Sequence, residues 1–382
     1  MQYSIFPIFL SFFVMGFIDI VGTLVGFASK HFEISSAMAG LLPFLCFFSF
    51  GLLSVPAGIL AHKKGKKFVL LSGLVLSFIG FVIPMLKFDN YGFLLISILL
   101  IGAGATMMQV AGFPILKDVS GEGKYPRNFT FAQFIKAIAS MAGPVLTAFV
   151  LSSWTNLFPL YSAIVAITFL LILSTKTEKT SVRQEQNRVS LGEIFNLLKN
   201  RYVLLMVFSI FLYVGAEVGI NSWIAKYLSS TYNFDITKWG TLGIAFFFLS
   251  LMAGRLIGSM ILNYLSAQKF FFICAIGGIV GVTGLFTGKI AIAFASIILI
   301  GFTFGNIFPL IFSILIDAMP DKSNELSGLM CMAVVGGAVT PLLMGVIADY
   351  SVMACFAIPL ISFFFISFAA IVTLRKNPAE NH

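Results

Sequence analysis

Charged residues are scarce in this chain. Asp, Glu, Lys and Arg make up 10% of its 382 residues, whereas 59% of the residues are hydrophobic and the mean hydropathy is +1.02. So few polar side chains cannot cover the water-facing surface of a fold of this size. The composition therefore excludes an ordinary soluble domain and predicts a chain whose solvent is lipid.

Cysteine and histidine are also rare. All four cysteines fall inside apolar runs without C-x-x-C spacing, and there are three histidines, which excludes a disulfide framework and gives no support to a metal site. We expect no cofactor. The sequence has no Ser/Lys or Asp/Asp pair at helical spacing that would suggest catalysis, and it has no extramembrane segment large enough for a catalytic domain. We therefore do not expect an enzyme.

Long apolar runs fill most of the chain, and each has roughly the 20 residues that a transmembrane helix needs. Strands of a membrane barrel would alternate polar and apolar residues, whereas residues 93–101 are apolar except for Ser97. The sequence predicts an all-α integral membrane protein with twelve transmembrane helices. The runs are centred near residues 16, 49, 77, 104, 142, 165, 214, 251, 279, 303, 336 and 362.

Basic residues are distributed unevenly among the loops. Seventeen of the 24 Lys and Arg residues lie in one alternate set of loops and termini, and five lie in the other. Because basic loops remain in the cytoplasm, we expect both termini and the long middle loop to be cytoplasmic. The net charge of +9 then reflects topology, and we expect no nucleic-acid partner. No basic residue precedes the first run, so we expect it to be retained as a span.

The two halves of the sequence repeat each other. Residues 97–102 (SILLIG) recur as residues 296–301 (SIILIG), an offset of 199. Further equivalent pairs lie 197 to 200 residues apart: Gly40 and Gly240, Pro144 and Pro341, and Asp19 and Glu217. The polar stretch 175–201 separates them. We predict six-helix bundles at residues 1–174 and 202–382, in the same orientation, joined by a cytoplasmic linker at 175–201.

Four charged residues interrupt the predicted spans: Asp19, Lys136, Glu217 and Arg255. A charge in the bilayer costs about 2.5 to 3.5 kcal/mol on insertion scales, so each needs a partner or a function. Their charges sum to zero, which indicates ion pairs or a shared aqueous cavity.

Asp19 and Glu217 occupy equivalent positions in the repeat, each on a stripe of small or polar residues at helical spacing. Asp19 shares its stripe with Gly16, Gly22, Thr23 and Gly26, and Glu217 lies one turn before Asn221. A carboxyl group in a cavity whose access to water changes can exchange a proton. We predict proton coupling by these acids; the alternative is that each only neutralises a basic neighbour.

The two basic residues have alternative interpretations. Lys136 follows Gln133 by three residues on one helix face, where it could pair with Asp19 or contact substrate, or extend its ammonium group to the cytoplasmic surface. We expect Arg255 to form a structural or gating ion pair with Asp317.

Uncharged polar residues lie at the same central depth, together with an aromatic ring. Amides can donate to and accept from hydroxyl groups, and aromatic rings cover the apolar face of a sugar. The alternative is hydrogen bonding between helices. The predicted substrate contacts are Gln109, Gln133, Lys136, Asn221, Trp223 and Asn306.

Several segments resemble the major facilitator superfamily, and within it the fucose:proton symporter group with its fucose and glucose/galactose permeases. Residues 58–67 (GILAHKKGKK) are similar to the family's loop signature, with His62 where an acid is usual. Residues 340–349 and 213–218 are also similar. The resemblance implies two bundles related by a parallel pseudo-twofold, alternating access around a midplane site, and a bacterial inner membrane.

Two differences from this group affect the coupling residues. Family members carry a glutamate in a helix-four segment E-T-A-A-N-P, where this chain has Gln109 in QVAGFP. The helix-one aspartate of the fucose symporter aligns near Gly22 or Thr23, one turn after Asp19. An anionic sugar, or a Lys136–Asp19 pair, would explain the lysine on helix five.

These observations together predict a monomeric secondary transporter that imports a monosaccharide or related polar solute with a proton, with sodium as the less favoured coupling ion. The alternatives are an effluxer of amphipathic compounds, suggested by the 44 phenylalanines, and a passive facilitator or transporter-like sensor that binds its ligand without concentrating it.

Overall fold

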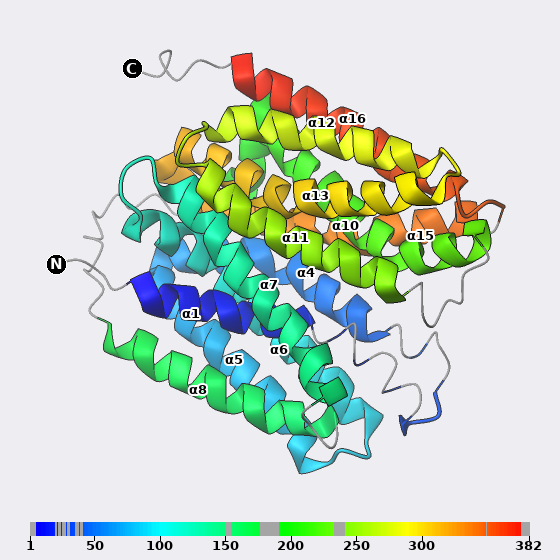
Figure 1. Cartoon of the computed structure of the whole chain (residues 1–382). Helices are drawn as coiled ribbons and strands as arrows, with labels where there is room; N and C mark the ends of the chain where they lie inside the picture. The colour runs from blue at the N-terminus through cyan, green and yellow to red at the C-terminus, as the bar shows by residue number, and fades with distance from the viewer. Residues whose placement is uncertain are drawn as a thin grey trace. The chain divides into compact units, whose positions relative to one another are not determined.

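The protein folds into long helices (Figure 1). The computed structural model describes residues 5–19, 41–149, 154–175, 191–232, 241–348 and 350–375, with a few positions between 21 and 38. Gly22, Thr23, Gly26 and most of the predicted linker lie outside the described residues.

Each of the twelve predicted runs coincides with a helix. In the first half these are α1 (Ile5–Met15) with the 3-10 turn η1 (Gly16–Asp19), α4 (Leu41–Lys64), α5 (Lys66–Leu86), α6 (Tyr91–Val119), α7 (Tyr125–Phe149) and α8 (Leu157–Ser174). In the second half they are α10 (Arg201–Tyr232), α11 (Thr241–Ile261), α12 (Ala267–Leu285), α13 (Ile290–Ala318), α14 (Ser323–Met332) with α15 (Gly336–Ala348), and α16 (Ala357–Arg375). A short helix, α9 (Leu191–Asn196), precedes α10.

In the described part of the chain, nine helices are long and apolar enough to cross a membrane. Two further apolar helices, at Ile5–Asp19 and Phe246–Ile261, are shorter. Asn90 caps α6, its side-chain oxygen accepting from the backbone N–H of Gly92 at 2.8 Å. Prolines lie inside α4, α6, α13 and α15, as membrane helices tolerate. The prediction of an all-helical membrane protein is confirmed.

The repeat seen in the sequence is also a repeat in packing. The contacts α5 with α6, α4 with α6, α5 with α8 and α1 with α6 recur as α12 with α13, α11 with α13, α12 with α16 and α10 with α13. A Cβ at Gly80 would lie 2.7 Å from Cγ1 of Ile101, and one at Gly281 would lie 2.6 Å from Cγ1 of Ile300. The repeated strings therefore sit at matching close helix contacts.

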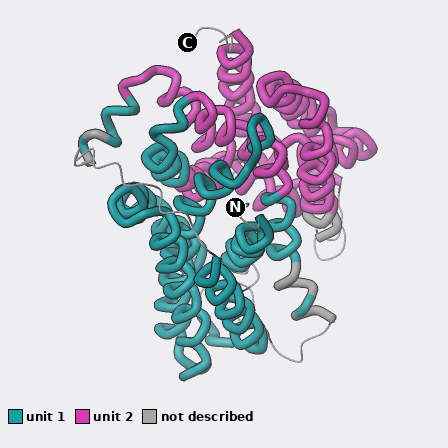
Figure 2. Tube along the Cα trace, turned by 90° about the vertical axis from the view of Figure 1, so that its left-hand side faces the viewer, with its two compact units in different colours: residues 1–125, 132–198, 319–332 teal, residues 126–131, 199–318, 333–382 magenta. Residues whose placement is uncertain are grey.

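The chain forms two compact units, drawn in teal and magenta in Figure 2. Unit 1 contains residues 1–125, 132–198 and 319–332, and unit 2 contains residues 126–131, 199–318 and 333–382. Unit 1 thus takes α14 from the second half of the sequence, and unit 2 takes a short segment of α7.

Helix α14 packs closely on α4 and α6 within unit 1. A Cβ at Gly58 would lie 3.0 Å from the carbonyl oxygen of Asn324, and one at Gly328 would lie 3.0 Å from that of Ser54. Ser327 Oγ donates to the carbonyl oxygen of Val110 at 2.9 Å. Glycines on both helices permit this approach, because a larger side chain would press against the facing backbone.

Candidate functional site

Asp19 lies at the end of η1 and its side chain is exposed. Ser140 Oγ on α7 lies 2.5 Å from Asp19 Oδ2, to which it donates, and 3.0 Å from the carbonyl oxygen of Lys136. Gly16 in the same turn packs directly against the backbone of α7 at Lys136. The absence of a side chain at Gly16 therefore allows η1 to bring a carboxylate onto α7.

Lys136 shares the surroundings of Asp19 without pairing with it directly. Among the described residues, no carboxylate lies within 4 Å of its ammonium group. The charges of Asp19 and Lys136 both act on Cys46 of α4, and that of Lys136 also acts on Cys331 of α14. The half-buried lysine thus lies inside unit 1, on the same helix as Ser140, which donates to Asp19 of η1.

Gln109 and Gln133 are enclosed in unit 1, with 3% and 2% of their surface exposed. Gln109 lies seven residues after Gly102 and so on nearly the same face of α6. A Cβ at Gly102 would lie 3.0 Å from Ser49 Oγ on α4. In this conformation the two amides are therefore covered by neighbouring helices.

A second polar cluster lies in unit 2, on α10. Tyr213, Glu217 and Asn221 follow one another at spacings of four residues, which places them along one face of the helix. Glu217 Oε1 lies 4.0 Å from an Nη of Arg255 on α11. Arg255 Nε donates to the carbonyl oxygen of Gly305 on α13 at 3.2 Å. The arginine therefore links three helices of this unit.

The predicted pairing of Arg255 with Asp317 does not fit this geometry. Asp317 lies near the end of α13, twelve residues after Gly305. At 1.5 Å per residue, that places it about 18 Å along the helix from the carbonyl that Arg255 contacts. The structure instead brings Arg255 to Glu217, and Asp317 lies exposed at the helix end.

Asn306 connects α11 to α13. Its side chain is fully buried, and Nδ2 donates to the carbonyl oxygens of Gly254 and Phe302, each at 3.0 Å. The hydroxyl of Tyr213 likewise donates to the carbonyl oxygen of Phe304 on α13, at 2.8 Å. These contacts favour the alternative interpretation of Asn306, a hydrogen bond between helices, over contact with a sugar.

Asn221 and Trp223 lie on different sides of α10. Asn221 Oδ1 is buried and has no hydrogen-bond partner in the part of the chain that is described. Trp223 is two residues further on, about 200° around the helix. A Cβ at Gly345 of α15 would lie 3.4 Å from the tryptophan ring, and Lys226 Nζ lies 5.0 Å from the ring centroid. The structure thus does not bring Trp223 together with Glu217 and Asn221.

One buried acid of unit 1 was not predicted from the sequence. Glu325 of α14 is 3% exposed, and its Oε1 lies 3.5 Å from Nδ1 of His62 at the end of α4. The basic residue of this pair stands where the loop signature usually has an acid. That substitution was visible in the sequence, but its acidic partner was not, because Glu325 lies 263 residues away.

The titratable residues in the described ranges do not gather into a metal centre. No group of three or more His, Cys, Asp or Glu side chains there could hold a metal ion. The polar chemistry is instead that of carboxylates paired with hydroxyl, guanidinium and imidazole groups within a helical bundle.

Comparisons with known proteins agree with this fold. The sequence model of the Major Facilitator Superfamily matches residues 8–333. A glucose/galactose transporter of Brucella abortus (strain 2308) is 27% identical over 384 residues, covering 95% of this chain and 92% of the relative. An L-fucose-proton symporter of Escherichia coli (strain K12) is 23% identical over 367 residues, covering 84% and 81%.

A solved structure of FucP, a transporter captured in the outward conformation, superposes with a TM-score of 0.86 at 18% sequence identity. The match covers 96% of this chain and 97% of that one. At this level of identity the likeness shows the major facilitator fold.

Proposed function

This chain belongs to the major facilitator superfamily, and from that premise we propose that it imports a monosaccharide together with a proton by alternating access. The relatives of nearly full coverage are named as glucose/galactose and fucose-proton transporters. The observation that carries the proposal is the carboxylate of Asp19, exposed in the first helical segment and hydrogen-bonded to Ser140.

We assign the proton to Asp19 rather than to Glu217. Glu217 lies beside the guanidinium group of Arg255, which keeps its charge at all physiological pH values and therefore favours the ionised carboxylate. Asp19 is held by a hydroxyl group, which can donate to a carboxylate or accept from a carboxylic acid. Ser140 therefore accommodates both protonation states without losing its hydrogen bond.

Asn221 is the strongest candidate for a sugar contact. Its oxygen has no partner in the described ranges, as is also true of Asn306, but Asn221 is half-buried and Asn306 is fully buried with its amide nitrogen bonded to two carbonyl oxygens. A sugar hydroxyl can donate to the Asn221 oxygen. Gln109 and Gln133 remain candidates that would require helix movement to become accessible. Lys136 would donate to the oxygen of a sugar hydroxyl or attract an anionic sugar, and its position near Asp19 would link substrate and proton binding.

The distribution of basic residues among the loops supports one orientation of the chain in the membrane. Both termini lie in the cytoplasm, because seventeen basic residues occupy that set of loops and five the other. The membrane is the inner membrane of a bacterium and the working unit is a monomer. Sodium is the alternative coupling ion.

Transport assays in proteoliposomes test the proposal. Radiolabelled glucose, galactose and fucose are offered with and without an inward proton gradient, and with and without sodium. We expect one of the sugars to accumulate only when the proton gradient is present. Accumulation that is unaffected by the proton gradient contradicts proton coupling, and transport of none of the sugars contradicts the substrate class.

Variants then locate the proton. We expect Asp19→Asn to abolish accumulation driven by the pH gradient while sugar exchange across the membrane persists, because exchange requires no net proton movement. Asp89→Asn is the matched control, since Asp89 is 90% exposed beside His31. Full accumulation by Asp19→Asn, with loss in Glu217→Gln, would transfer the role to Glu217.

A further inference from the structure

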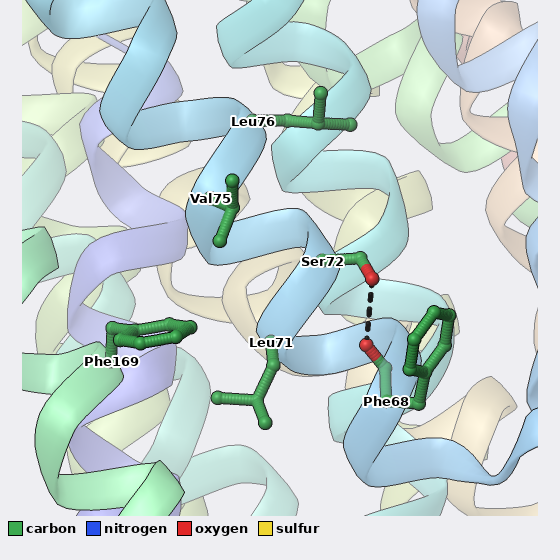
Figure 3. Close-up of a pocket in the computed structure, with 6 residues that line it drawn as sticks. All are labelled: Phe68, Leu71, Ser72, Val75, Leu76 and Phe169. Carbon is green, nitrogen blue, oxygen red and sulfur yellow. Dashed lines mark hydrogen bonds between the residues drawn. The ribbon is translucent and has the colours of Figure 1, made fainter.

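A groove between α5 and α8 contains no residue of either polar cluster. Its volume is about 470 Å³, and the side chains that line it are apolar except for Ser72. Figure 3 shows Phe169 of α8 pointing toward α5, where the other five lining residues follow one another along the helix. Those residues are Phe68, Leu71, Ser72, Val75 and Leu76.

The single polar group in the groove is already used. Ser72 Oγ donates to the carbonyl oxygen of Phe68 at 2.9 Å, as Figure 3 shows. Phe68 and Val75 are 44% and 43% exposed although both are large and apolar. In a chain that spans a membrane, such a face lies against lipid. An apolar chain therefore suits the groove better than a polar solute.

Two lysines stand at one end of the groove. Lys64 Nζ lies 4.9 Å from the centroid of the Phe68 ring. Lys67, next to Phe68, extends to α8 and donates to the carbonyl oxygens of Leu173 and Thr175 at 3.1 and 2.5 Å. Neither ammonium group forms an ion pair with a carboxylate of the described ranges, whereas the neighbouring Lys66 is neutralised by Asp118 at 2.7 Å. This end of the groove thus carries two lysines that no carboxylate of the described ranges neutralises.

The dimensions agree with one leaflet of a bilayer. From Phe68 to Leu76 is eight residues of helix, or about 12 Å at 1.5 Å per residue. Half of a hydrocarbon core of roughly 30 Å is about 15 Å. The basic end is at the helix termini and the apolar part runs toward the middle of the span, which is the order of headgroup and acyl chain in a phospholipid.

We propose that the α5–α8 groove binds an anionic glycerophospholipid, with one acyl chain between Phe68 and Phe169 and the headgroup phosphate at Lys64 and Lys67. Basic groups between transmembrane helices on the cytoplasmic side recognise such headgroups. A zwitterionic lipid fits less well because its own ammonium group would face two lysines. The inference rests on the proposed orientation, in which the loop between α4 and α5 is cytoplasmic, and does not depend on the transported substrate.

Native mass spectrometry of the full-length protein tests the site. Dioleoylphosphatidylglycerol or dioleoylphosphatidylcholine is added in equal amounts to the detergent-purified chain, and retained lipid is counted. We expect retention of phosphatidylglycerol to exceed that of phosphatidylcholine at least threefold. We expect Lys64→Gln, which removes a charge, and Leu71→Trp, which fills the groove, each to reduce it at least threefold.

Lys269→Gln is the matched control. Lys269 is an exposed lysine in the first turn of α12, the repeat equivalent of α5, and its loss should leave retention unchanged. Lys67→Gln is a secondary variant, because it also removes the hydrogen bonds to the end of α8 and thereby lowers thermal stability in any lipid. Folding of each variant is checked by its thermal unfolding midpoint without added lipid.

Four outcomes overturn the proposal. Equal retention of the two lipids removes the charge recognition, and an undiminished signal in Leu71→Trp places the acyl chain elsewhere. Full competition by glycerol 3-phosphate indicates a headgroup pocket that needs no chain. If a second protein binds this face in equimolar amount and no lipid is retained, the groove has a different occupant.

Discussion

Replacement of Asn306 by alanine distinguishes a structural amide from a sugar contact. The substitution removes the two hydrogen bonds, each 3.0 Å long, to the carbonyl oxygens of Gly254 and Phe302. Hydrogen bonds within membrane bundles contribute about 0.6 kcal/mol each on average. The shortened side chain also leaves a void about the size of a small group, which costs ~1 kcal/mol. We expect the free energy of unfolding to fall by about 2 kcal/mol.

The assay measures two quantities on the same purified variant: the free energy of unfolding by denaturant titration, and the affinity for the transported sugar by ligand-dependent stabilisation. We expect Asn306→Ala to lose stability and to keep its sugar affinity within about twofold. Asn221→Ala is the matched comparison, because it removes the same amide from a site where the side chain forms no hydrogen bond to the described residues, whereas Nδ2 of Asn306 forms two. It should lose sugar affinity while its stability is unchanged or slightly higher.

The reverse pattern would refute this reasoning. If Asn306→Ala keeps its stability and loses sugar affinity, the amide contacts substrate and its hydrogen bonds to Gly254 and Phe302 are dispensable. A conservative variant, Asn306→Gln, adds a check. The longer amide must fit against Gly258, which faces Asn306 directly, so it should also lose stability if the close contact matters.

Two further predictions concern packing and charge. A double-mutant cycle of His62→Ala with Glu325→Gln should show a favourable coupling of about 1 kcal/mol, because Nδ1 of the imidazole lies 3.5 Å from Oε1 of the buried carboxylate. Additive losses of stability in the two single variants would contradict a direct interaction. In a thermal unfolding assay, Gly301→Ala should lower the unfolding midpoint more than Gly102→Ala does. A Cβ at Gly301 meets the backbone of Phe247, whereas one at Gly102 meets the side chain of Ser49, which can shift. Equal decreases in the midpoint would contradict the packing argument.

The direction in which Trp223 points from its helix could have been predicted from the sequence. Trp223 lies six residues after Glu217, about 240° around the helix. An α-helix with Glu217 facing inward therefore directs the tryptophan to another neighbour, which the structure identifies as α15. Periodicity alone argues against grouping Trp223 with Glu217 and Asn221.

The partner of Arg255 could not be obtained in that way. Asp317 and Glu217 are both acids on helices of the same half, and the sequence does not state how far one helix is shifted along another. The contact between Arg255 and the carbonyl oxygen of Gly305 sets that shift. It leaves Glu217 within reach and Asp317 about 18 Å away along α13.

What the sequence by itself determined is the set of helices and their repetition. Both follow from local properties: an apolar run of about 20 residues is stable in lipid only as a helix, because every backbone polar group must be satisfied within the segment. The offset of 197 to 200 residues between the halves then gave equivalent helices, including the equivalence of Asp19 and Glu217.

What only the tertiary structure decided is which polar groups meet. Asp19 is joined to Ser140, Glu217 to Arg255, and Glu325 to His62, so the two equivalent acids have chemically different partners. Those contacts depend on the depth and rotation of separate helices, which are set by close packing at residues such as Gly16 and Gly58. A pattern within one helix indicates which of its faces points inward, but it carries no information about the depth of that helix relative to its neighbours.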